Sequence, residues 1–336
     1  WKGSYNNEDD IIWNKISSNL EQTKFLGYEE NFIEEKIEKI IIDNTEIADL
    51  DNKDKKASLI FNSTPFYAEG GGQVGDTGLI KNNFFTFEVI DTQKRGNNIY
   101  EHIGQLKTGK IKVNTKAKLF IDKSRRKKIA AHHSATHLLH SSLRRILGKH
   151  VTQKGSLVSE SKLRFDISHS QPISHELLND IERDINLQII NNYPVKFNTY
   201  KKDEAMEMGA IAIFGEKYED EVRVVQMGSI DNKIFSVELC GGTHVRNTGE
   251  IGLFKIISES SLASGIRRIE AVVGIKAMEL FQKMEKDVGS LAQSLKVNKN
   301  KVHDRIIKLL DEKKALEKEL KNIKNIKTKV FTSETN

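Results

Sequence analysis

The feature that most constrains the fold is a long stretch, residues 25–121, in which short apolar runs alternate with turn residues. Runs such as FFTFEVIDT and GKIKVNTKAKLFID are rich in β-branched and aromatic residues, and Asn, Asp and Gly separate them. β-Strands favour the first kind of residue, and tight turns favour the second. The stretch therefore predicts many short strands, arranged as a small β-barrel or sandwich.

A different pattern follows directly. The segment DKSRRKKIAAHHSATHLLHSSLRRILG contains no Pro and has Gly only at its end. It predicts a helix that starts near Asp122 or Ser124 and stops at Gly148. Up to residue 274, helical and strand patterns then mix. ISHELLNDIERDINLQIINN reads as an amphipathic helix capped by Ser174, and EVRVVQMGSI and KIFSVEL read as strands.

The final segment, residues 275–336, is rich in Lys, Glu and Leu. Apolar residues recur at every seventh position: Val302, Leu309, Leu316 and Ile323. Ile306 and Leu320 occupy the alternate positions, and Lys313 interrupts them. This spacing predicts a coiled coil or a long helical hairpin, with a lone amphipathic helix packed on the domain as the alternative. The chain as a whole is thus expected to be an α+β protein.

Composition narrows the class of protein. Cys240 is the single cysteine of 336 residues, so an internal disulfide is excluded. We find no apolar run long enough to span a bilayer and no signal-peptide pattern, and we therefore expect a cytoplasmic protein without membrane contact. The net charge of +6 suits a polyanionic partner such as nucleic acid, and it equally suits a merely basic soluble protein.

Histidine and cysteine suggest a metal site. Four histidines lie close together on the predicted helix: His132, His133, His137 and His140. His133 and His137 are four positions apart and share one helix face, but their neighbours leave the choice of pair open. Cys240 and His244, with a Gly-Gly turn between them, form a second pair. Together the pairs supply a Cys-His₃ set that zinc prefers, although a free cysteine is often only a small core residue.

Two familiar motifs are excluded. The histidine pair is not a metalloprotease signature, because Ser134 stands where that motif needs Glu. The glycines Gly70, Gly72 and Gly75 match the spacing of a dinucleotide-binding loop, but strands rather than a helix are expected to follow. We therefore interpret these glycines as tight turns or as close backbone approaches.

Several blocks resemble one family. Five blocks are similar to the editing region of alanyl-tRNA synthetases, and together they cover about residues 58–274. They are FNSTPFYAEGGGQVGDTG, HHSATHLLHSSLRRILG, HVTQKGSLVSESKLRFDISH, IAIFGEKYEDEVRVV and ELCGGTHVRNTGEIGLFKIISESSLASGIRRIEAVVG. The opening WKGS and the absence of an initial Met suggest an internal fragment. The resemblance implies four parts: a helical linker from the tRNA-recognition region (1–24), a β-barrel (25–121), a zinc-containing α+β editing core (122–274) and a coiled-coil-like start of the C-terminal oligomerisation region (275–336).

The resemblance also implies a metal and its ligands. In the family motif the metal-binding pair flanks Ser-Ala-Thr, which selects His133 and His137 here, and Cys240 and His244 complete the Zn²⁺ site. His132 and His140 then become packing or surface residues. ATP and Mg²⁺ would serve only the ligase domain, which the resemblance places outside these residues.

The implied activity is hydrolysis of the ester in mischarged Ser-tRNA(Ala) and Gly-tRNA(Ala), with the 3′ end of tRNA(Ala) as partner. Thr136, Gln153 and Ser156 match polar positions of the family's site. Arg267, or its neighbour Arg268, matches a position that meets the tRNA end or the charge of the transition state.

A basic turn opens the predicted histidine helix, and it is suited either to phosphates or to solvent: Arg125, Arg126, Lys127 and Lys128. Residues 275–336 can support a homo-oligomer. Two other functions fit the same residues. One is a free-standing trans-editing hydrolase of the AlaX type, and the other is a non-catalytic tRNA-binding module with structural zinc.

Overall fold

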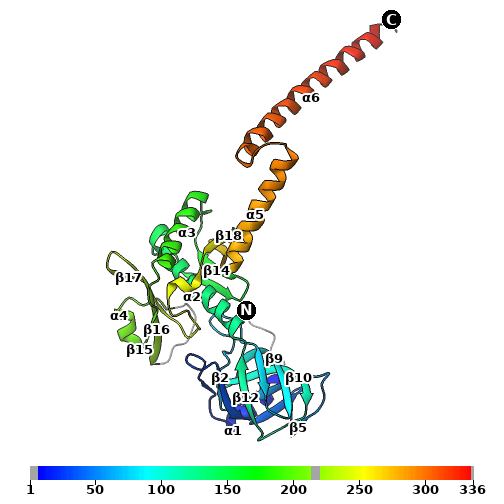
Figure 1. The fold of residues 1–336 in the computed structure, drawn as a ribbon. Coiled ribbons are helices and arrows are strands. Elements are labelled where there is room, and N and C mark those ends of the chain that lie inside the picture. Colours follow the sequence, from blue (N-terminus) through cyan, green and yellow to red (C-terminus); the bar gives the residue numbers. More distant parts are fainter. Residues whose placement is uncertain (1–6, 213–219, 334–336) are drawn as a thin grey trace. The chain divides into compact units, whose positions relative to one another are not determined.

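The computed structural model describes residues 7–212 and 220–333 (Figure 1). The chain forms two compact units, Trp1–Ala277 and Met278–Asn336. The first unit is a mixed α+β structure, and the second is helical. None of the described helices is long and apolar enough to cross a membrane.

The N-terminal part of the first unit is mostly β-structure. Helix α1 (Asn7–Asn19) precedes an eight-stranded antiparallel sheet. In spatial order its strands are β2 (Phe32–Lys36), β12 (Lys116–Ile121), β8 (Gly78–Lys81), β9 (Phe85–Arg95), β10 (Ile99–Gly109), β6 (Lys56–Ile60), β3 (Lys39–Ile42) and β4 (Thr45–Ile47). Two small pairs accompany the sheet: β1 (Lys24–Phe25) with β7 (Ser63–Thr64), and β5 (Asp49–Leu50) with β11 (Ile111–Lys112).

This sheet buries one face. On β12, Ala117, Leu119 and Ile121 are buried, whereas Lys116 and Lys118 between them are exposed. The alternation is what a half-buried strand requires. The buried side chains of β12 join those of the neighbouring strands in one core.

The predicted β-barrel is not closed among the described residues. Closure requires hydrogen bonds between the two outermost strands. Strands β2 and β4 are outermost here, and each pairs on one side only, with β12 and β3 respectively. The sequence predicted the strands, but it carries no signal for which outer strands pair.

The second part of this unit combines helices with two antiparallel sheets. Its helical elements are α2 (Lys123–Leu147), α3 (His175–Ile190), α4 (Lys202–Glu207) and the 3₁₀ turn η1 (Thr248–Ile251). One sheet has the spatial order β13 (Gln153–Val158), β14 (Leu163–Ser168), β19 (Ile266–Val273) and β18 (Phe254–Ala263). The other has the order β15 (Lys196–Lys201), β16 (Glu221–Ile230) and β17 (Lys233–Leu239). Side chains of α2, α3 and both sheets share a second core.

Helix α2 starts and stops where the sequence predicted. The Asp122 side chain accepts a hydrogen bond from the Arg125 N–H, which otherwise has no helical partner. At the other end Gly148 has φ of 116°, a value that favours glycine. Helix α3 begins in the same way, because Ser174 accepts from Leu177 N–H.

An ion pair fixes α2 to the β-rich part. Arg126 is buried and forms a salt bridge with Asp76, which is 1% exposed. The same guanidinium donates to the Pro65 carbonyl at 2.9 Å. Arg126 is therefore not available for phosphates, whereas Lys127 and Lys128 of the same basic turn are exposed.

The C-terminal segment is helical. It contains α5 (Ile275–Ser294), the 3₁₀ turn η2 (Lys299–Lys301) and α6 (Val302–Ser333). The apolar stripe on α6 is exposed at Leu316, Leu320 and Ile323. The helical prediction is confirmed, and the coiled coil, which needs a second helix on this stripe, stays a prediction.

Candidate metal centre

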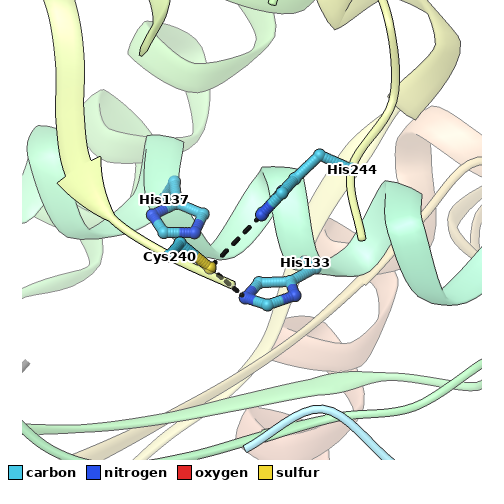
Figure 2. Close-up of side chains that lie close together, drawn as sticks. All are labelled: His133, His137, Cys240 and His244. Carbon is cyan, nitrogen blue, oxygen red and sulfur yellow. Dashed lines mark hydrogen bonds between the residues drawn. The ribbon is translucent and has the colours of Figure 1, made fainter. Parts of the chain in front are cut away.

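Four side chains from two distant segments converge in the first unit. Helix α2 supplies His133 and His137, and the loop after β17 supplies Cys240 and His244 (Figure 2). Their candidate ligand atoms all lie within 4.8 Å of one another. The Cys240 Sγ lies 3.4 Å from His133 Nε2 and 3.3 Å from His244 Nε2.

The helix and the strand both determine this convergence. His133 and His137 are one helical turn apart, and their rings stack with centroids 5.2 Å apart. Strand β17 ends at Leu239, so Cys240 and His244 leave the sheet in a loop opposite α2. All four residues are buried or partly buried.

Each imidazole is held through its Nδ1 atom by a side chain outside the set. The pairs are His133 with Gln73 Oε1 at 2.8 Å, His137 with Glu238 Oε2 at 2.7 Å, and His244 with Ser134 Oγ at 3.2 Å. Such partners fix the ring orientation and tautomer of metal-binding histidines. The His137 Nε2 atom is buried and has no hydrogen-bond partner in the described part of the chain. The residues present therefore fit a metal ion held by one sulfur and three Nε2 atoms, a set within zinc's preference.

The charges at the centre favour a cation. Burial alone would raise the pKa of the Cys240 thiol, but the imidazoles of His133 and His244 outweigh it and hold this pKa well below its usual value. Burial would likewise lower the pKa of His137, yet Glu238 and Cys240 raise it to about 10. Cys240 thus faces the site as a thiolate, and Glu238 supports the His137 ring from its Nδ1 side, so that a metal ion can take the place of a proton among the ligand atoms.

Glycine allows the loop to approach α2. A Cβ atom on Gly242 would lie 2.1 Å from Cε1 of His133, so no larger residue fits without movement. Gly242, between the two candidate ligands of the loop, is therefore a steric requirement of the site, whereas a Cβ on Gly241 would find its nearest atom, the Tyr28 hydroxyl oxygen, 3.8 Å away.

The glycine-rich loop that we excluded as a nucleotide site contributes to this centre. Gly72 has φ of 81°, and a Cβ there would lie 2.8 Å from the Ser156 carbonyl oxygen. This close approach brings Gln73 beside the ligands, where its amide donates to Thr243 Oγ1 at 2.9 Å and its oxygen accepts from Thr243 N–H. The spacing of the neighbouring glycines predicted tight turns or close backbone approaches, and it did not point to Gln73.

Glu238 and Ser134 were also missed. Glu238 is 2% exposed. In the sequence, the usable signal was an acidic residue within the predicted strand KIFSVEL, two positions before Cys240. Ser134 accepts from Val245 N–H at 3.1 Å in addition to its contact with His244. The sequence pattern showed only that it was not the Glu of a metalloprotease.

His132 and His140 have structural contacts. His132 Nδ1 lies 2.9 Å from the Lys128 carbonyl, and His132 Nε2 accepts from Val273 N–H. His140 Nδ1 lies 3.1 Å from Glu238 Oε1. Both rings are buried, and neither belongs to the four-residue cluster.

The predicted catalytic residues lie on three elements. Thr136 is buried on α2 between two ligands, and its hydroxyl donates to the His132 carbonyl at 2.9 Å. Gln153 and Ser156 are half-buried on β13. Arg267 on β19 forms an ion pair with Glu259, with a bond of 2.7 Å. Gln153 and Arg267 both face Ile167 of β14 in the strand register, which places them in one row of the sheet.

An open cleft of about 470 Å³ lies beside the cluster. Its wall includes His244 and Thr243, so it reaches one of the four candidate ligands. Tyr28, Phe197 and Arg223 also line it. The four predicted catalytic residues are not part of this wall.

Two family models match the chain. Residues 3–125 match "tRNA synthetases class II (A)", and residues 222–270 match "Threonyl and Alanyl tRNA synthetase second additional domain". The second match contains Cys240 and His244.

A curated relative matches almost the whole chain. The alanine–tRNA ligase of Mesorhizobium japonicum (strain LMG 29417 / CECT 9101 / MAFF 303099) is 43% identical over 325 residues, which is 95% of this chain. The chain spans 36% of that relative's length. Because the similarity extends along nearly all of its residues and agrees with both family models, the chain belongs to the alanyl-tRNA synthetase family.

Proposed function

We propose that this chain is the editing part of an alanine–tRNA ligase and that it hydrolyses the ester of Ser-tRNA(Ala) and Gly-tRNA(Ala). The observation that supports this most is the buried Cys-His₃ cluster, whose ligand atoms lie within 4.8 Å of one another beside an open cleft. The cluster lies partly within the match to the second additional domain of threonyl and alanyl synthetases.

The need for such a reaction follows from binding energies. A pocket for alanine rejects glycine weakly, because one methyl group contributes only about 1–3 kcal/mol. Serine adds only a hydroxyl, which an apolar pocket also rejects weakly. A second site that hydrogen-bonds the hydroxyl discriminates far better, because alanine leaves its polar groups unpaired.

In this proposal the metal is Zn²⁺, and His133, His137, Cys240 and His244 hold it. When bound, it would supply a Lewis acid that polarises or positions the aminoacyl group. Gln73, Glu238 and Ser134 keep the three imidazoles oriented, as their contacts with the Nδ1 atoms support.

The protein's polar side chains take the remaining roles. Thr136, Gln153 and Ser156 recognise the serine hydroxyl, and Arg267 meets the tRNA end or the charge that develops during hydrolysis. The family motif supports these roles. The role of Arg267 requires that its ion pair with Glu259 opens, or that the guanidinium interacts with the substrate while it stays paired, because the guanidinium already contacts Glu259.

The test is single-turnover deacylation of Ser-tRNA(Ala) and Ala-tRNA(Ala). We expect the serine ester to be cleaved much faster and a chelator to abolish the difference. Gln153→Met should lower the ratio of the two rates by a few-fold to about tenfold, because one hydrogen bond contributes about 0.5–1.5 kcal/mol. Zinc content should not change, since Gln153 is not a ligand.

Equal rates on the two tRNAs would reject the editing function. They would favour a tRNA-binding module with structural zinc, which four protein ligands also suit because structural sites are closed. An unchanged ratio in Gln153→Met would reject only the role of that residue. A free-standing trans-editing hydrolase would show the same preference for Ser-tRNA(Ala) as the editing part of a ligase.

Two further proposals concern the whole chain. The first is a division into four parts: a linker (1–24), a β-rich part (25–121), an editing core (122–274) and the start of the oligomerisation region (275–336). The exposed apolar stripe of α6 supports self-association of the last part.

A further inference from the structure

The backbone of the cysteine loop is held by one arginine. Arg223 on β16 donates from one terminal nitrogen to the Cys240 carbonyl at 2.9 Å and to the Gly242 carbonyl at 3.0 Å. The Cys240 N–H in turn donates to the Arg223 carbonyl at 3.0 Å. Arg223 therefore fixes the loop on both sides of Gly241.

A tyrosine from the N-terminal part holds the carbonyl between them. The Tyr28 hydroxyl donates to the Gly241 carbonyl at 2.5 Å, across 213 positions of sequence. The Arg223 guanidinium lies 4.2 Å from the centre of the Tyr28 ring and 4.5 Å from that of Phe197. A guanidinium is weakly hydrated and stacks on aromatic faces, so these contacts keep it in place while it donates.

These contacts occupy three successive carbonyls in a turn that has two glycines. Glycine has the most backbone freedom of all residues, so Gly241 and Gly242 by themselves would leave Cys240 loosely oriented. We propose that Tyr28 and Arg223 are positioning residues, which set the geometry of the Cys240 thiolate and of His244 at the metal. This inference rests on the proposed metal site, and it assigns to the β-rich part a direct role in shaping it.

Metal binding tests the inference without any need for activity. Tyr28→Phe removes the hydroxyl but keeps the ring on Arg223, and Arg223→Lys keeps the charge but loses the planar fork. Co²⁺ titration of the metal-free chain, followed by the thiolate-to-cobalt and d–d absorption bands, reports the geometry around the metal. Competition with a chelator reports the Zn²⁺ affinity.

We expect Tyr28→Phe to weaken Zn²⁺ binding by about two- to tenfold, as the loss of one hydrogen bond predicts. Arg223→Lys should weaken it by about 10–100-fold, the range for partners that orient metal ligands. Both variants should shift the cobalt bands. Arg95→Lys is the matched control, because the Arg95 guanidinium also lies over an aromatic ring, that of Trp13, and also makes a polar contact, here an ion pair with Glu101, away from the metal centre.

The outcomes separate the two proposals. Unchanged cobalt spectra and affinities in both variants would overturn the positioning role while leaving the metal site intact. A parent chain that binds no Co²⁺ or Zn²⁺ would overturn the metal site and this inference with it. Shifted bands in the two variants, with the parent spectrum retained in Arg95→Lys, would support it.

Discussion

At position 242 the structure has room only for glycine. The His133 ring occupies the space that a side chain would need, and His133 is itself held by Gln73. The ring therefore cannot move away without losing the bond that orients it. Steric fit at one residue thus controls how closely the loop with Cys240 and His244 approaches His133.

Gly242→Ala should consequently impair metal binding by about tenfold or more, because it displaces a ligand that its neighbours orient. It should also destabilise the chain by about 1–3 kcal/mol through overpacking. Zinc content and urea unfolding are the measurements. Gly70→Ala is the control, since its nearest non-neighbouring atom would be 3.7 Å away and its φ is not positive. Full zinc occupancy in Gly242→Ala would contradict the steric argument.

Individual residues differ in how well the sequence could predict them. The spacing of His133 and His137 on a helix, with Cys240 and His244, indicated a ligand set, and the family resemblance selected among the histidines. Gln73 lies 60 positions from the ring it orients, in a loop whose glycine spacing matches only a dinucleotide motif that we excluded. Contacts of that kind depend on how elements pack, which a single sequence does not encode locally.

At the scale of elements, strand β10 carries a buried histidine. His102 is fully buried, with Phe61 and Phe66 edge-on to its ring at 5.2 Å. Its nitrogens lie 3.0 Å from the Leu59 carbonyl and 2.7 Å from Thr64 Oγ1. Burial lowers the pKa of His102 from 6.5 to about 4, although hydrogen bonds to backbone groups oppose this shift.

This lowered pKa predicts an acid-sensitive sheet. Between pH 6.5 and about 4 the unfolded chain binds a proton at His102 and the folded chain does not, so the free energy of unfolding falls as the pH falls. The stability that depends on a neutral His102 is fully present above pH 6.5. Near pH 4 the resulting loss in the free energy of unfolding approaches about 3 kcal/mol. Urea unfolding of metal-free protein at pH 7 and pH 5 should show a smaller difference in His102→Gln than in the parent. An equal loss of stability between pH 7 and pH 5 in both proteins would show that His102 is not the source of the acid sensitivity.

The same sheet shows where prediction at this scale stops. Alternating residues predicted strands such as β12, and the capping residues Asp122 and Ser174 predicted helix starts, because these signals are local. Barrel closure depends on the pairing of β2 with β4, which are not neighbours in the sheet order. No local pattern distinguishes an open sheet from a closed one.

At the scale of the whole molecule, the candidate metal joins segments that the chain keeps far apart. His133 and Cys240 are 107 positions apart, and Gln73 and Tyr28 reach the same centre from the β-rich part. A ligand that binds only the folded state stabilises it in proportion to the logarithm of its concentration over its Kd. The metal should therefore stabilise the first unit as a whole.

Removing the metal should lower the free energy of unfolding by about 3 kcal/mol if the free metal is at a hundredfold excess over its Kd. Thermal unfolding with and without a chelator measures this loss. Cys240→Ala should unfold at a lower temperature and should no longer respond to the chelator. A parent chain whose unfolding temperature is the same with and without chelator would exclude a stabilising metal.

The separation of the ligands along the chain also orders events during synthesis. His133 and His137 leave the ribosome well before Cys240, and at about 5–20 residues per second the delay is roughly 5–20 s. During that interval α2 can dock on the β-rich part through Arg126, but the nascent chain holds only half of a metal site. Capture of a metal by all four candidate ligands would thus be a late step of biogenesis. A nascent chain that stalls before Cys240 would carry the two histidines of α2 without the cysteine of the set.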